Sequence, residues 1–209
     1  MTLETLRFFN DIIRPWEELN DFLQQPYAVQ FNLSSITTKA WNLATNISHY
    51  PELIGKKRFC SIGITRFQAI DDMADSSKHG KLSKPSRQCE IEVDSIFEVN
   101  DAGQYNFLRN AVIISHATLG EIDFMPFTLN IINYWLKELQ DADPTIHRQL
   151  VVKENSDNFG PTAKLEIDFK YCVEFKSTKS RFFNRLPNQD LVPLSIGITV
   201  AFELFQKTP

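Results

Sequence analysis

Three carboxylates, Asp71, Asp72 and Asp75, occur together in the run DDMAD. On a helix, residues 71 and 75 lie one turn apart and share a face. Carboxylates spaced in this way can hold Mg²⁺, which prefers oxygen ligands and is often shared with a phosphate. The plainer interpretation is a solvated face near a helix end, with Lys78 as a neighbouring counter-charge. We therefore expect no bound metal or other cofactor, and keep the three acids as the metal-site alternative.

The DDMAD run resembles the aspartate-rich magnesium motif of isoprenoid synthases. The resemblance implies carboxylates that clamp a diphosphate through metal ions, within a large all-α fold that carries a second acidic motif. This chain offers neither the all-α pattern nor the second motif, so the resemblance is confined to these few residues.

Arg109 and His116 are the second set of residues that could act together. The segment RNAVIISH resembles the Arg–polar–x(3–5)–His signature of HEPN ribonucleases, with Asn110 at the polar position. The resemblance implies that both side chains face a dimer cleft from one helix and act on RNA without a metal. The β-branched residues between them instead favour a strand, in which residues seven apart point to opposite faces. The secondary structure of residues 105–118 therefore discriminates between the two interpretations.

His79, beside Lys78 at the predicted end of the third helix, is a further candidate for acid–base chemistry. The surrounding pattern loosely resembles a set of small uncharacterised bacterial proteins whose third helix ends in Asp/Asn-x-x-Lys-His. The resemblance spans roughly residues 27–139 and implies no activity. Cations also complement the helix dipole at a C-terminus, and this structural role is the one we favour. The matching positions are Ala40, Trp41, Asp75, Lys78, His79 and Trp135.

Two short basic stretches could contact nucleic acid. One follows the third helix; the other interleaves cations with aromatic residues, a combination that suits single strands because rings stack on bases. In the second stretch only Phe182 and Phe183, predicted to lie in a loop, are free to stack. A solvated strand is the simpler interpretation. The candidate contacts are Lys78, Lys81, Lys84, Arg87, Lys179, Arg181 and Arg185.

The composition is that of an ordinary globular protein, with 43% hydrophobic residues, 23% charged residues and a net charge of −4. Such a charge argues against a bulk polyanion binder. The three cysteines are far apart and odd in number, which suits a reducing compartment. The N-terminal residues do not read as a signal peptide, and no apolar run approaches ~18 residues. We expect a cytoplasmic protein without membrane contact.

Helical spacing of apolar residues predicts four helices. Residues 2–24 form the first, with a kink near Arg14 because Pro15 follows. The second begins near Leu33 and ends before Pro51, the third covers roughly 59–76, and the fourth spans 127–140 and begins at Pro126. The apolar stripe predicted for the first helix comprises Leu6, Phe9, Ile13, Trp16 and Leu23.

Alternation of apolar and polar residues predicts strands at 89–99, 105–115, 164–176 and 195–205. The fold class is therefore α+β: a helical N-terminal third followed by a mainly antiparallel sheet with one covering helix. We expect a helical region (1–77), a solvated basic linker (78–88) and a β-rich region (89–209), which share one core. The residues predicted to be buried on the last two strands are Ile167, Phe169, Val173, Ile198 and Phe202.

The sequence does not identify an activity. It lacks a Gly-rich phosphate loop, a G-x-S-x-G elbow, an H-E-x-x-H motif and a C-x-x-C pair. We expect a non-catalytic accessory protein that binds a protein partner, with a link to phage defence as a further suggestion. The alternatives are a HEPN-like, metal-independent ribonuclease and a protein that binds RNA or single-stranded DNA. The pattern does not indicate the partner's identity or the oligomeric state.

Overall fold

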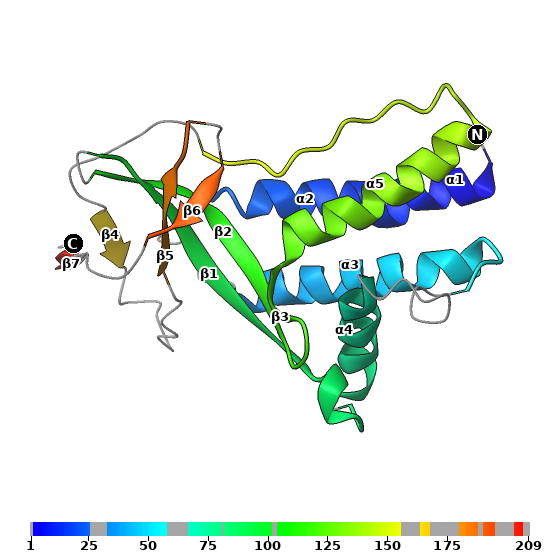
Figure 1. Ribbon diagram of the computed structural model, residues 1–209, viewed down its shortest axis with the longest axis horizontal. Coiled ribbons are helices and arrows are strands. Elements are labelled where there is room, and N and C mark those ends of the chain that lie inside the picture. The colour runs from blue at the N-terminus through cyan, green and yellow to red at the C-terminus, as the bar shows by residue number, and fades with distance from the viewer. Residues whose placement is uncertain are drawn as a thin grey trace. The chain divides into compact units, whose positions relative to one another are not determined.

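The fold is α+β, as predicted: helices come first, followed by a mixed, mostly antiparallel sheet and a further helix (Figure 1). This computed structural model describes residues 2–25, 33–57, 67–80, 82–101, 104–155, 164–167, 180–187, 190–194 and 203–206.

The chain divides into two compact units. The first, called the helical unit, comprises Met1–Phe22, Leu33–Glu92 and Val112–Val152. The second, called the sheet unit, comprises Leu23–Asn32, Val93–Ala111 and Lys153–Pro209.

The first predicted helix is interrupted by a π-helical turn. Helix α1 (Leu3–Phe8) leads into the π turn η1 (Phe9–Ile13), and α2 (Arg14–Phe22) follows. Pro15 has no N–H to donate, and the nearby Asp11 carbonyl accepts a hydrogen bond of 2.8 Å from Nδ2 of Asn46 instead.

The predicted stripe of the first helix was wrong at its start. Leu6 is 41% exposed and Phe9 is only half-buried, whereas Phe8 is fully buried. The wide π turn rotates α1 relative to α2, so a stripe extrapolated back from Trp16 with α-helical spacing misses by one or two residues. The residues of this segment that form the core are Phe8, Ile12, Ile13, Trp16, Leu19 and Leu23.

Helix α3 (Leu33–Leu53) passes through Pro51, which corrects the prediction that it ends before this residue. The proline lies in the last turn, where its missing N–H costs the helix a single backbone hydrogen bond. Backbone bonds from Ile54 to the Tyr50 carbonyl and from Lys56 to the Pro51 carbonyl then close the end.

Helix α4 (Gln68–His79) is the described part of the predicted third helix, which extends three residues further than expected. It ends at Gly80, whose φ of 69° lies in the left-handed region that favours glycine. A short 3₁₀ turn, η4 (Pro85–Arg87), follows it, so the predicted linker contains local structure at both ends.

Helix α5 (Phe124–Ala142) begins earlier than predicted because Asp123 caps it, with its carboxylate accepting from the Met125 N–H. Pro126 therefore lies in the first turn rather than at the start. The indole Nε1 of Trp16 on α2 donates a buried hydrogen bond of 3.0 Å to Thr128 on α5. Together with Phe8 against Tyr50 (ring centroids 4.8 Å apart) and Tyr50 against Trp135 (5.3 Å), this contact joins α1, α2, α3 and α5 into one core.

The predicted hairpin is confirmed as β1 (Cys89–Val99) and β2 (Tyr105–His116). The main sheet has the order β3-β2-β1-β5-β6, with β3 (Gly120–Asp123), β5 (Ser180–Arg185) and β6 (Leu191–Pro193). Strands β2–β3 and β5–β6 pair antiparallel, whereas β1 and β5 are parallel, with Phe97 opposite Phe182.

Of the two C-terminal strand predictions, β4 (Lys164–Ile167) and β7 (Glu203–Gln206) are described, and they pair in parallel as a separate sheet. The rest of both segments and the side chains predicted to be buried there lie outside the described residues. Among the helices that the structure describes, none is both long and apolar enough to cross a membrane.

Candidate functional site

The adjacent acids Asp71 and Asp72 of α4 are fully buried, which corrects their interpretation as part of a solvated face. Helix α4 packs against α3, where Asp71 meets its polar partner, whereas the partners of Asp72 lie on η4, β2 and α4 itself. Oδ1 of Asp71 accepts a hydrogen bond of 2.6 Å from the Ser48 hydroxyl on α3. A buried carboxylate needs such donors, because its desolvation would otherwise cost several kcal/mol, about the magnitude known for unpaired buried charges.

Asp72 lies at the centre of a polar group that we call the Asp72 cluster: Gln68, Asp72, Asp75, Arg87 and His116. One oxygen of Asp72 accepts from Nε of Arg87. The other accepts from Nε2 of His116 at 3.0 Å and from the Gln68 amide at 3.3 Å. Arg87 also donates from Nη2 to Asp75 at 2.7 Å, so its guanidinium bridges two carboxylates.

The hydrogen bonds of His116 determine which ring nitrogen carries the proton. Nδ1 faces the backbone N–H groups of Thr118 and Leu119, each at 3.2 Å, and so must accept. The proton of the neutral ring therefore lies on Nε2, which donates to Asp72. With both nitrogens engaged and the side chain fully buried, the imidazole has no nitrogen directed toward a ligand.

The ionisation of Arg87, within the cluster, and of Cys89, beside it, follows from their surroundings. Burial disfavours the charged form of Arg87, but hydrogen bonds and charge from Asp75 and Asp72 outweigh it and raise the pKa of the guanidinium. Burial also raises the pKa of the Cys89 thiol, whose Sγ lies 3.4 Å from the Ser76 hydroxyl. A thiol with a raised pKa is a poor nucleophile, so Cys89 adds no reactive group to the cluster.

Arg109 and His116 do not form a shared site. Residues 105–116 form strand β2 and not the helix that the HEPN-like arrangement requires. Seven residues of extended chain span about 23 Å, far beyond the reach of two groups acting on one phosphate. Arg109 is itself buried, and its guanidinium lies 3.4 Å from the backbone carbonyl of Asn110.

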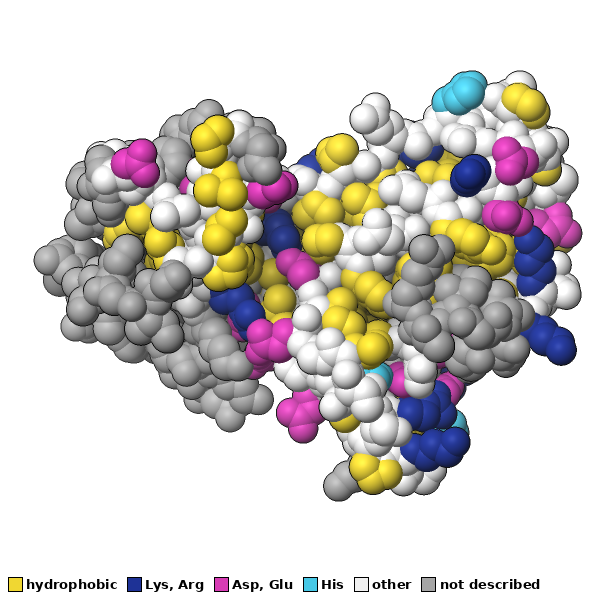
Figure 2. Space-filling model, in the orientation of Figure 1, with side chains coloured by type: hydrophobic (Ala, Val, Ile, Leu, Met, Phe, Trp, Pro, Cys, Tyr) yellow, Lys and Arg dark blue, Asp and Glu magenta, His cyan; other side chains and the backbone are white. Residues whose placement is uncertain are grey.

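The first basic stretch is partly described. Lys78, His79 and Lys84 are exposed, and Lys and Arg side chains gather near the lower end of α4 in Figure 2. The Lys78 ammonium contacts Nε2 of His49 on α3. Lys81 lies outside the described residues. Arg87 is paired with Asp72 and Asp75 in the Asp72 cluster. Fewer positive charges of this stretch can therefore contact a phosphate backbone than the sequence suggested.

The second basic stretch belongs to the sheet unit, and its described arginines are paired. Arg181 contacts Asp94, and Arg185 lies 3.0 Å from Glu98 and 2.8 Å from Glu154. These hydrogen bonds raise the pKa of Arg185. Lys179 lies outside the described residues.

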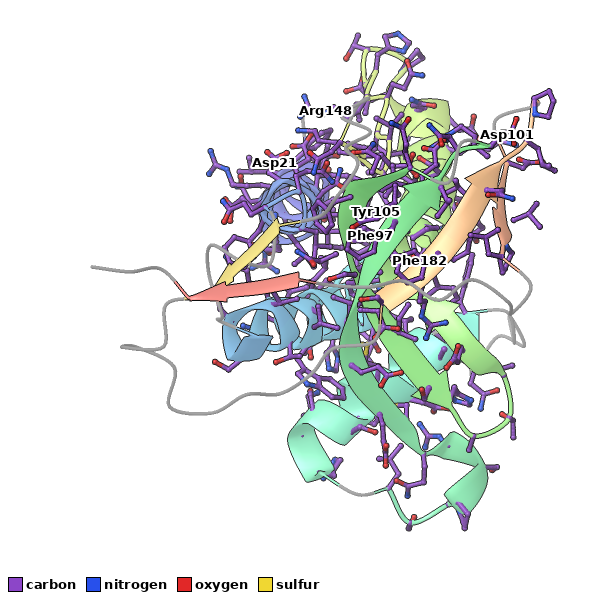
Figure 3. The ribbon with its side chains drawn as sticks, turned by 90° about the vertical axis from the view of Figure 1, so that its left-hand side faces the viewer. Asp21, Phe97, Asp101, Tyr105, Arg148 and Phe182 are labelled. Atoms are coloured by element: carbon purple, nitrogen blue, oxygen red, sulfur yellow. The ribbon has the colours of Figure 1, made fainter. Side chains whose placement is uncertain are left out.

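Phe182 and Phe183 lie in strand β5, which corrects their placement in a loop. The ring of Phe182 stacks on Phe97, with centroids 5.3 Å apart and planes inclined by 19°. Figure 3 shows the two rings next to Tyr105 on neighbouring strands. Because Phe97 is itself buried, at least one face of the Phe182 ring is used inside the sheet unit rather than for stacking on a base.

No group of three His, Cys, Asp or Glu side chains within the described residues is arranged to hold a metal ion. The acids of the DDMAD run bond to different neighbours: Asp71 to Ser48, and Asp72 to His116 and Arg87.

Sequence reasoning missed four interacting residues in this region. Gln68 stands four residues before Asp72, a spacing that could have suggested their contact. His49 and Glu52, one turn apart on α3, form an ion pair that the same rule could have found. Ser48 has no such signal, because it lies 23 residues from Asp71 in sequence.

No protein-family model, curated protein or solved structure matches this chain.

Proposed function

We propose that this protein is a non-catalytic, cytoplasmic accessory protein that binds a protein partner. The observation that carries the proposal is the hydrogen bonding of His116 and Asp72, the two candidate residues whose side chains are best suited to acid–base chemistry or metal binding. Both nitrogens of His116 and both oxygens of Asp72 are bonded inside the helical unit. These groups hold α4, η4 and the turn after β2 together, which is a structural task.

The surface we propose for the partner is the end of the helical unit at which α1 begins and α3 ends (Figure 1). Leu3 and Leu6 on α1 are 62% and 41% exposed, and Leu53 on α3 is 50% exposed. Contact between Phe8 and Tyr50 places the two helices side by side there. Apolar side chains that gather on a surface are typical of protein–protein contacts, whereas single ones need no explanation.

The test compares full-length tagged protein with the double variant Leu3→Glu/Leu6→Glu in capture from cells that express it natively. We expect one protein to co-elute at fixed stoichiometry with the wild type and to be lost with the double variant. Val151→Glu is the matched control, because Val151 is 57% exposed and lies near Asn20, at the far end of α2. A partner retained by the double variant would refute the surface, and no stoichiometric partner at all would refute the function.

A further inference from the structure

Three side chains on the exposed surface of α3 and α4 form a hydrogen-bonded series. Nδ1 of His49 lies 2.9 Å from Oε2 of Glu52, one turn further along α3. Nε2 of the same imidazole contacts the ammonium of Lys78, in the last turn of α4. The His49 side chain is 28% exposed and that of Glu52 53% exposed, so small molecules can reach this surface.

The chemistry of the three groups determines the direction of each hydrogen bond. An ionised carboxylate only accepts, so Nδ1 of His49 carries the proton and donates to Glu52. Nε2 then has a lone pair and accepts from Lys78, because an ammonium only donates. His49 is therefore held in the tautomer and orientation in which its basic nitrogen faces the amine.

This order of groups is that of an activated nucleophile: an attacking group, a base within hydrogen-bond reach and a third group that orients the base. Transfer of a proton from Lys78 to His49 leaves a neutral amine beside an imidazolium, which the Glu52 carboxylate stabilises. The neutral amine is the nucleophilic form of lysine, and it lies at a surface that reagents can approach.

We propose that Lys78 is a reactive lysine that accepts acyl groups from thioesters, with His49 as its base and Glu52 as the orienting carboxylate. The amine nitrogen attacks the thioester carbonyl, a C–N bond forms and the C–S bond breaks. The Lys78 ammonium loses two protons in all: His49 takes the first and releases it to water, and the second leaves the nitrogen as the amide forms and passes to the departing thiolate. The products are an N-acyl lysine, a free thiol and one proton in solution. Acylation removes the positive charge at the end of α4.

The test measures acetylation of the purified full-length chain by a small acetyl thioester, S-acetyl-N-acetylcysteamine. Peptide mass spectrometry gives the initial rate at each lysine. Lys84, which is also exposed and lies six residues further on, serves as the internal reference. We expect Lys78 to react about tenfold faster than Lys84, below the ~10²-fold effect of a general base inside an active site because this site is open to water.

Two variants test the roles of the neighbours. His49→Gln should reduce the rate at Lys78 to that at Lys84, and Glu52→Gln should give an intermediate rate, while Lys84 reacts equally in all three proteins. If the contact with His49 only holds Lys78 in place, Lys78 will react no faster than Lys84 in the wild type, which would overturn the proposal. Selectivity that survives His49→Gln would also overturn it. Equal circular dichroism spectra of the three proteins exclude unfolding as the cause.

Discussion

Nε2 of His116 lies 3.0 Å from Oδ2 of Asp72, and both side chains are completely buried. The pair connects strand β2 to helix α4 across 44 residues of sequence. Through Nδ1, the same imidazole also accepts from the backbone N–H groups of Thr118 and Leu119, in the turn between β2 and β3. One side chain therefore fixes a strand, a helix and a turn.

Replacement of His116 by Ala should lower the free energy of unfolding by about 3 kcal/mol. Asp72 loses a buried donor, and the N–H groups of Thr118 and Leu119 lose their acceptor. Urea denaturation followed by tryptophan fluorescence measures the loss. The control His147→Ala, at an exposed position, should change the same free energy by less than about 0.5 kcal/mol. Equal urea midpoints for the two variants would contradict the structural role of His116.

Arg87 should couple energetically to Asp75. Both side chains are about three-quarters buried and lie 2.7 Å apart, so a double-mutant cycle of Arg87→Met and Asp75→Asn should give a coupling of about 0.5–1 kcal/mol. Arg87→Lys should recover only part of the wild-type stability, because an ammonium cannot bridge Asp72 and Asp75 as the planar guanidinium does. If Arg87→Lys were as stable as the wild type, the bridge between Asp72 and Asp75 would make no contribution to stability.

Tyr50 carries a buried hydroxyl that has no hydrogen-bond partner among the described residues. Burial, with a contribution from the charge of Glu4, raises its pKa to about 12. Because the unfolded chain ionises first, near pH 10, the wild type should lose stability as the pH rises from about 10 to about 12. Below pH 10 the neutral hydroxyl is present in both states, so this pH-dependent loss is absent.

Tyr50→Phe removes both the unsatisfied buried hydroxyl and the group that ionises at high pH. At pH 7 the variant should be as stable as the wild type or more stable by up to about 1 kcal/mol, since an unsatisfied buried polar group is lost. It should also show a smaller loss between pH 10 and 12. Urea midpoints at pH 7, 10 and 12 measure both. A variant that is less stable at pH 7 would mean that the hydroxyl has a partner in solution.

The elements that the sequence predicted well are those determined by local pattern. Strand β1 follows from the alternation around Val93, and α4 from the helical spacing of Ile70 and Ala74. The errors arose where an extra residue changes the helical register or where the position of a residue in a helix outweighs its low helix propensity. The π turn before Arg14 moved Leu6 out of the stripe, and Pro51 was tolerated because only one backbone bond near the helix end is lost.

The Asp72 cluster could not be assembled from sequence. Asp72 and His116 were each singled out, but for different reasons: one as a metal ligand and the other as an acid–base group paired with Arg109. Their contact depends on how β2 packs beside α4, which no local spacing records. Arg87 was assigned to nucleic acid because the carboxylates that neutralise it belong to another element.

Purified protein should leave single-stranded RNA intact in the presence of EDTA, because metal-free cleavage needs a base and a cation at one phosphate. Arg109 and His116 are seven residues apart on an extended strand, and His116 is buried with both nitrogens bonded.

Binding to RNA should be weak for a related reason, since Arg87, Arg181 and Arg185 already pair with carboxylates. Fluorescence anisotropy at low salt, where phosphate contacts are strongest, measures it most sensitively. Lys84→Ala, which removes an exposed cation, should leave the anisotropy unchanged. Tight binding that weakens steeply with salt and with Lys84→Ala would favour a nucleic-acid partner. EDTA-resistant cleavage abolished by both Arg109→Ala and His116→Asn, in variants that remain folded, would replace the accessory protein with a ribonuclease.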